Sequence, residues 1–102
     1  MSSLAEYEIE RLSSKLGKNR AGHWHFCAAC NRLHRLPFDG WQFDGNVETP
    51  TFTPSFNHTW GKDRRCHYFV TAGEIMFLPD CTHSMAGITA TMVDLPDAHD
   101  NL

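Results

Sequence analysis

The stretch His-Trp-His-Phe-Cys-Ala-Ala-Cys at residues 23–30 decides the fold expected of this chain of 102 residues. Its first five residues alternate as side chains do in a β-strand, and the aromatic pair Trp24 and Phe26 is expected to face the core. The opposite face carries His23, His25 and Cys27. Cys27 and Cys30 then enclose a tight turn whose two thiolates suit one tetrahedral metal ion. The stretch therefore predicts a zinc-ribbon-like knuckle.

The two remaining cysteines also stand beside histidines. Cys66 is followed at once by His67, and Cys81 is followed two residues later by His83. Cysteines of a reducing compartment are more typical of metal sites than of disulfides. The sequence predicts one zinc ion per chain, bound by Cys27, Cys30, Cys66 and a fourth ligand that is either His83 or Cys81. The histidines expected beside this metal, without binding it, are His25, His34 and His67.

A two-residue turn at Ala72-Gly73 predicts the register of a central β-hairpin. Tyr68 then faces Phe77 across the hairpin, and Cys66 lies at its open end, close to residues 81–83. Both faces of this hairpin carry apolar side chains. We therefore expect it to be covered on both sides, at the centre of the core.

The rest of the chain alternates short β-like runs with turn residues. Strands are expected near residues 23–27, 33–38, 41–43, 51–56, 66–70, 74–78 and 88–93. Before them, Ser3 and Glu6 fit a capping box, and apolar residues from Ala5 to Leu16 follow at helical spacing. The predicted fold class is mainly β: a small, zinc-stapled antiparallel β domain, either a sandwich or a partly open barrel, with one N-terminal α-helix.

Three segments follow from this pattern. They are an N-terminal helix at residues 1–17, a zinc-binding β domain at residues 18–97 and a frayed tail at residues 98–102. The formal net charge of -3 argues against a nucleic-acid binder that relies on a broad basic surface. No apolar run reaches the roughly 18 residues of a membrane span, and no signal peptide is apparent. We expect a cytoplasmic protein with no membrane contact, and its oligomeric state stays open.

Several motifs together resemble a family of small, mostly uncharacterised phage and prophage proteins with a domain of unknown function. They lie at Trp24–His34, Thr49–Ser55, Cys66–Phe69, Asp80–Gly87 and Val93–Pro96. The resemblance covers roughly residues 23–97 and does not include the segment Ser3–Leu16. It implies that Cys66 and His83, rather than Cys81, are the metal ligands of the second half. It also implies a phage origin and a location in the cytoplasm of a bacterial host.

The function expected from this origin is that of a non-enzymatic phage accessory protein. Its zinc-stabilised β domain would bind a host or phage protein, for example as an inhibitor of a bacterial defence system such as an anti-CRISPR. Two other classes stay open. One is a nucleic-acid-binding zinc ribbon that uses Arg32 and Arg35, and the other is a zinc-dependent hydrolase-like enzyme with an open metal position. For the enzyme, Asp80 is the acid nearest to the site in sequence, and His25 or His34 are the candidate bases.

A serine hydrolase is not expected from the sequence. The chain contains no Gly-x-Ser-x-Gly elbow, which is the local motif of one large hydrolase class. Ser55 and Ser84 both stand among turn-forming residues. The sequence therefore predicts no catalytic serine. The main expectation, a non-enzymatic binding protein, names no catalytic residue and no enzymatic activity.

Overall fold

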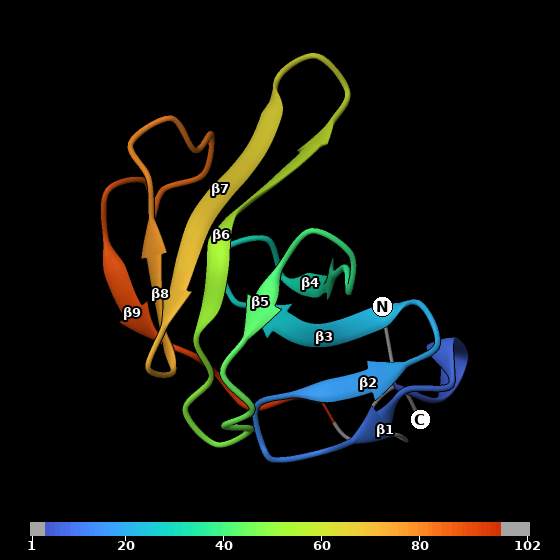
Figure 1. Ribbon diagram of the computed structural model, residues 1–102. Coiled ribbons are helices and arrows are strands. Elements are labelled where there is room, and N and C mark those ends of the chain that lie inside the picture. Colours follow the sequence, from blue (N-terminus) through green and yellow to red (C-terminus); the bar gives the residue numbers. More distant parts are fainter. Residues whose placement is uncertain (1–3, 97–102) are drawn as a thin grey trace.

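The computed structural model describes residues 4–96, which form two antiparallel sheets (Figure 1). The first sheet consists of β1 (Glu10–Arg11), β2 (Gly17–Asn19), β3 (Gly22–Cys27) and β4 (Arg32–Leu36), in that order. The second consists of β5 (Gln42–Phe43), β6 (Phe52–Trp60), β7 (Arg64–Thr71), β8 (Glu74–Phe77) and β9 (Thr89–Thr91), also in chain order. The mainly β class expected from the sequence is confirmed. No helix of the described residues is long and apolar enough to cross a membrane.

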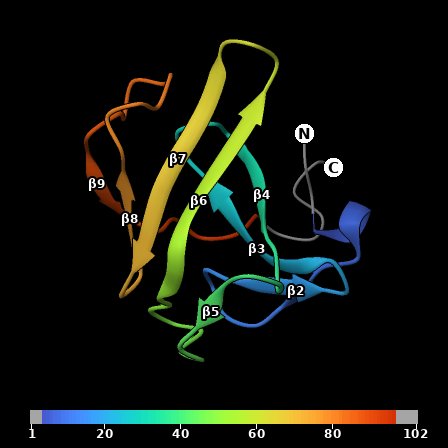
Figure 2. The same cartoon turned by 45° about the horizontal axis from the view of Figure 1, so that its top comes forward.

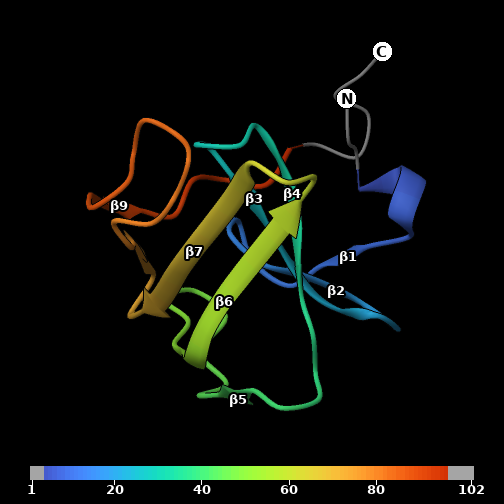
Figure 3. The same cartoon turned by 90° about the horizontal axis from the view of Figure 1, so that it is seen from above.

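The two sheets form two layers. The long strands β6 and β7 pass across β3 and β4 in Figures 2 and 3, so the two layers cross rather than align. The core between them holds the large, fully buried side chains Tyr68, Phe52, Phe56, Leu36 and His25. Burial of these apolar surfaces on facing sheets is the main stabilising contribution expected for such a fold.

The predicted N-terminal α-helix is wrong. Within the described part of this segment, residues 4–17, the only helical turn is the 3-10 turn η1 (Ala5–Tyr7), and Glu8 adopts left-handed backbone angles (φ 56°, ψ 42°) that end it. The hydroxyl of Ser13 accepts hydrogen bonds from the amides of Lys15 and Leu16, which stabilises a turn instead of a helix. The resulting β1–β2 hairpin buries Leu16 completely. The division at residues 17 and 97 stays a prediction, and the expected tail at 98–102 lies outside the described residues.

The burial of β3 is the reverse of the expected one. His23, His25 and Cys27 face the second sheet and are buried, whereas Trp24 and Phe26 are only partly buried. The two aromatic residues pack instead on a smaller cluster that contains Leu4, Ile9, Leu33 and Leu95. The polar face of β3 is buried because the second sheet provides partners for its side chains. The Tyr68 hydroxyl lies beside His25, and the Cys66 thiol lies beside Cys27.

The central hairpin has the predicted register, with Tyr68 opposite Phe77 and Val70 opposite Ile75. Its expected burial on both faces is wrong. Cys66, Tyr68 and Val70 point inward, but Phe69 and its cross-strand partner Met76 are 37% and 47% exposed. The second sheet therefore has one covered face and one open face, as antiparallel sheets often do.

Tyr68 is the centre of a buried hydrogen-bond network. Its hydroxyl lies 2.7 Å from Nε2 of His25 and 2.9 Å from Nε2 of His58. A phenol can donate to one imidazole and accept from the other. Burial lowers the pKa of His25 to about 3 and that of His58 to about 4, so both rings are neutral near pH 7.

Replacement of Tyr68 by phenylalanine is expected to lower the free energy of unfolding by about 1–3 kcal/mol, because the buried Nε2 of His25 loses its partner. Urea denaturation measures this change. Tyr7→Phe is the matched control, since Tyr7 is 42% exposed and stacks on Trp24 through its ring. Equal midpoints for the two variants would contradict a stabilising role of the Tyr68 hydroxyl.

Candidate active site and metal centre

The open face of the second sheet carries a serine, a histidine and an aspartate in a hydrogen-bonded chain. Oγ of Ser55 lies 3.2 Å from Nε2 of His67. Nδ1 of the same imidazole lies 3.1 Å from each carboxylate oxygen of Asp80. This order of contacts, hydroxyl to imidazole to carboxylate, is that of a Ser-His-Asp triad.

Each member of the triad is positioned by a different segment. Ser55 lies on β6, where the register against β7 shifts between Phe52 and Phe56. Such irregularities re-aim a side chain beside the neighbouring strand. His67 points outward from β7, because the flanking Cys66 and Tyr68 point inward. Asp80 follows β8, whose extension is held to β7 by a 2.8 Å bond from the Leu78 amide to the His67 carbonyl.

Two neighbours hold the Asp80–His67 pair in place. Nη1 of Arg65 lies 2.9 Å from a carboxylate oxygen of Asp80. Hydrogen bonds from His67, and then from Arg65, lower the pKa of Asp80, so this carboxylate stays ionised. The thiol of Cys81 accepts from the His67 amide at 3.2 Å and donates to the His67 carbonyl at 3.1 Å. The residue after Asp80 is thus attached to the backbone of the triad histidine.

The contacts suit nucleophilic catalysis. With Nδ1 of His67 protonated and donating to Asp80, Nε2 is free to accept the proton of the Ser55 hydroxyl. The serine and the histidine are half-buried and Asp80 is exposed, so all three side chains are in contact with solvent.

Sequence reasoning missed all three residues in these roles. The sequence predicts no catalytic role for Ser55, because no local hydrolase motif surrounds it, and it places His67 beside the metal. A signal was nevertheless present in the chain. Cys66 was expected near Cys81, and this proximity also brings their neighbours His67 and Asp80 together. The strand pattern, in turn, predicted a strand near residues 51–56, which contains Ser55.

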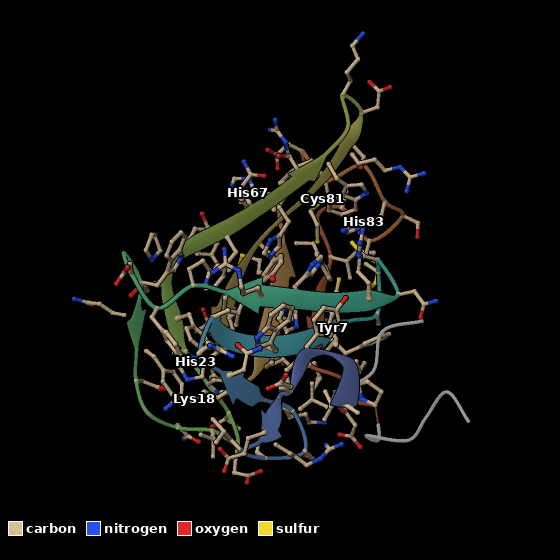
Figure 4. All side chains as sticks on the ribbon, turned by 90° about the vertical axis from the view of Figure 1, so that its right-hand side faces the viewer. Tyr7, Lys18, His23, His67, Cys81 and His83 are labelled. Atoms are coloured by element: carbon tan, nitrogen blue, oxygen red, sulfur yellow. The ribbon has the colours of Figure 1, made fainter. Side chains whose placement is uncertain are left out.

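Behind the triad, on the inner face of β7, three thiols converge. Ligand atoms of Cys27, Cys30, His34 and Cys66 all lie within 4.8 Å of one another. Cys66 also belongs to a second such group with Cys81 and His83. These clusters can hold a metal ion. The first group joins Cys66 to the Cys27–Cys30 pair, whereas the predicted fourth ligands Cys81 and His83 are grouped with Cys66 alone. Figure 4 shows Cys81 and His83 at the same end of the molecule as His67.

The distances suit a tetrahedral thiolate site. Zinc–sulfur bonds of about 2.3 Å imply sulfur–sulfur separations of about 3.8 Å. The sulfurs of Cys27 and Cys66 are 3.9 Å apart. Nε2 of His83 lies 3.4 Å from the sulfur of Cys66, close to the roughly 3.6 Å that two ligands of one zinc ion would show.

The close contacts among the thiols shift their pKa values in opposite directions, and this favours the binding of a cation. Hydrogen bonds from the Cys30 and Cys66 thiols lower the pKa of Cys27. The same contact with Cys27 raises the pKa of Cys66 and raises that of Cys30 to about 12. Three thiols this close can ionise together only beside a positive charge, which a divalent metal supplies.

The histidines expected beside the metal have three different positions. His34 belongs to the first cysteine group, and its Nε2 is buried without a hydrogen-bond partner among the described residues. His25 binds the Tyr68 hydroxyl instead. His67 is part of the triad. The choice of the fourth ligand stays a prediction.

Comparison with known proteins identifies the family. A family model described as the bacterial ubiquitination-like system serine protease, BubE, matches residues 4–78. The chain belongs to this family. The match to BubE includes Ser55 and His67, and it also includes the N-terminal segment that the sequence resemblance had left out. No curated protein and no solved structure matched the chain.

The BubE match corrects two expectations. The prediction of a non-enzymatic phage accessory protein that inhibits bacterial defence is wrong, because the family is described as a serine protease of a bacterial system. The expected lack of enzymatic activity is wrong for the same reason. The physical cause of the error is that a triad assembled from two strands and a loop leaves no local motif, whereas closely spaced cysteines do.

Proposed function

We propose that this chain is a serine peptidase of a bacterial ubiquitination-like system, with Ser55 as nucleophile, His67 as general base and Asp80 as the carboxylate that orients His67. The observation that carries the proposal is the continuous chain of contacts from Ser55 to His67 to Asp80. Membership of the BubE family, whose description names a serine protease, supports it independently.

In the first half of the reaction, Oγ of Ser55 attacks the carbonyl carbon of the scissile bond while its proton passes to Nε2 of His67. The bond to the leaving group then breaks, and His67 gives that proton to the departing amine. Ser55 is left as an acyl ester. In the second half, water gives a proton to His67 and its oxygen attacks the ester, and the proton returns to Ser55 as the acid product leaves.

The open sheet face suits a protein substrate of that system. Phe69 lies two residues after His67 on the same face, next to Met76 on β8, and both are exposed. Apolar side chains next to a triad can hold a polypeptide segment against the sheet. The proposed partner is therefore a protein with an accessible, extended segment at the cleavage point.

A second proposal concerns the metal. We propose that the cysteine cluster binds one zinc ion through Cys27, Cys30 and Cys66, with a histidine as fourth ligand. The support is the approach of the Cys27 and Cys66 sulfurs to 3.9 Å in a buried site. Four protein ligands leave no open coordination position, so the proposed role is structural rather than catalytic.

Incubation with a fluorophosphonate probe is expected to label the protein at one residue, Ser55, because such probes form a phosphonate ester with a serine that a neighbouring histidine activates. Intact-mass measurement gives the stoichiometry, and peptide mapping gives the position. The matched control is Ser84→Ala, since Ser84 is an exposed serine in the loop after Asp80 and has no place in the triad. Labelling elsewhere, or none in the folded wild-type protein, would refute the proposed peptidase.

A further inference from the structure

The triad and the cysteine cluster occupy opposite faces of the same strand. Cys66 and His67 are consecutive on β7, and consecutive side chains of a strand point to opposite faces. Cys66 is fully buried between the sheets, whereas His67 reaches Ser55 on the open face. A ligand that fixes Cys66 therefore fixes the backbone of the triad histidine.

The loop after β8 also carries one residue of the triad and, close to it in sequence, one residue beside the cysteine cluster. Asp80 belongs to the triad, and three residues later His83 lies 3.4 Å from the sulfur of Cys66. Between them, the Thr82 amide donates to the Arg65 carbonyl at 3.0 Å. The Cys81 thiol bonds to the backbone of His67. The loop that carries the triad aspartate thus returns to the metal cluster.

His34 on β4 of the first sheet offers the alternative fourth ligand, and it is grouped with all three sulfurs, whereas His83 is grouped with Cys66 and Cys81. A metal bound through His34 would join β3, β4 and β7 and would leave the loop at 80–87 without a metal bond. A metal bound through His83 joins β3, β7 and this loop. The two ligand sets therefore differ in whether the metal holds the segment that carries Asp80.

We infer that a zinc ion bound by Cys27, Cys30, Cys66 and His83 attaches the loop at 80–87 to β7 and so assembles the His67–Asp80 half of the active site. This inference rests on the proposed peptidase function. His83 is then a positioning residue, because it acts on the reaction only through the placement of Asp80. The 3.4 Å approach to Cys66, which matches two ligands of one tetrahedral zinc ion, is the observation that favours His83 over Cys81.

The test compares His83→Ala, His83→Cys and the loop control Ser84→Ala. Each protein is loaded with zinc, and the release of zinc to a chromogenic chelator is measured beside the rate of fluorophosphonate labelling. His83→Ala is expected to release zinc faster and to be labelled about 100-fold more slowly, the loss that a misplacement of about 1 Å can cause. His83→Cys, which restores a ligand, is expected to recover most of the labelling. Ser84→Ala should match the wild type in both measurements.

Cobalt(II) substitution gives a readout that does not depend on activity, and it needs only the folded wild type and His83→Cys. If His83 is a ligand, the cysteine variant adds a fourth thiolate, and the cobalt–thiolate charge-transfer absorption rises by about one third. An unchanged cobalt spectrum would overturn the inference. So would a His83→Ala protein with wild-type zinc release and labelling, or a His34→Ala protein that loses zinc while His83→Ala retains it.

These outcomes separate the inference from the proposed function. A wild-type protein that is labelled at Ser55, together with a His83→Ala variant labelled equally well, overturns the coupling and leaves the peptidase intact. A zinc-loaded wild-type protein that is not labelled at all overturns both.

Discussion

Ser55→Ala is expected to lower kcat/KM for hydrolysis of an activated ester by about 10⁴–10⁶, because loss of any one triad member removes most of the concerted catalysis. The substitution deletes a single oxygen from a half-buried side chain and leaves the strand pairing unchanged. The melting temperature should therefore stay close to that of the wild type. Steady-state kinetics and thermal denaturation on the same preparation measure both quantities.

Asp80→Asn is the companion variant. It keeps the size of the side chain but removes the negative charge that accepts from Nδ1 of His67, and a loss of about 10⁴ in kcat is expected. Ser84→Ala serves as the control for both substitutions. If Ser55→Ala or Asp80→Asn retained more than a tenth of the wild-type activity, the assigned roles would be wrong.

Removal of the metal is expected to abolish cooperative folding. Binding of structural zinc contributes about 10–16 kcal/mol in small sites, as much as the whole stability of a typical domain of this size. Cys27→Ser or Cys30→Ser should therefore give protein without a thermal transition, and treatment of the wild type with a strong chelator should do the same. Circular dichroism across a temperature ramp, with the zinc content measured in parallel, tests both.

Substitution of a cysteine outside the proposed ligand set, Cys81, provides the control. Cys81→Ser should be milder than Cys66→Ser, since a serine hydroxyl can still donate to the His67 carbonyl and accept from its amide. Cys66, in contrast, belongs to both ligand groups. Equal damage from the two changes would favour Cys81 as a metal ligand. A wild-type melting temperature for Cys27→Ser would contradict a structural metal.

The strands and the hairpin register followed from local patterns. Alternation and turn residues act between neighbours in sequence, so the pairing of Tyr68 with Phe77 could be read from the Ala72-Gly73 turn. The N-terminal helix failed because its apolar spacing also suits a turn and a short hairpin. The Ser13 hydroxyl and the burial of Leu16 decided between them.

The sequence by itself determined the β class, most strand positions and the grouping of Cys27, Cys30 and Cys66. These features depend on short-range spacing and on the chemistry of thiols. Only the tertiary structure decided which face of β3 is buried and that Ser55, His67 and Asp80 meet. The physical reason is that a triad needs only three side chains in contact, and Ser55 and Asp80 are 25 positions apart without any local constraint on their order or spacing.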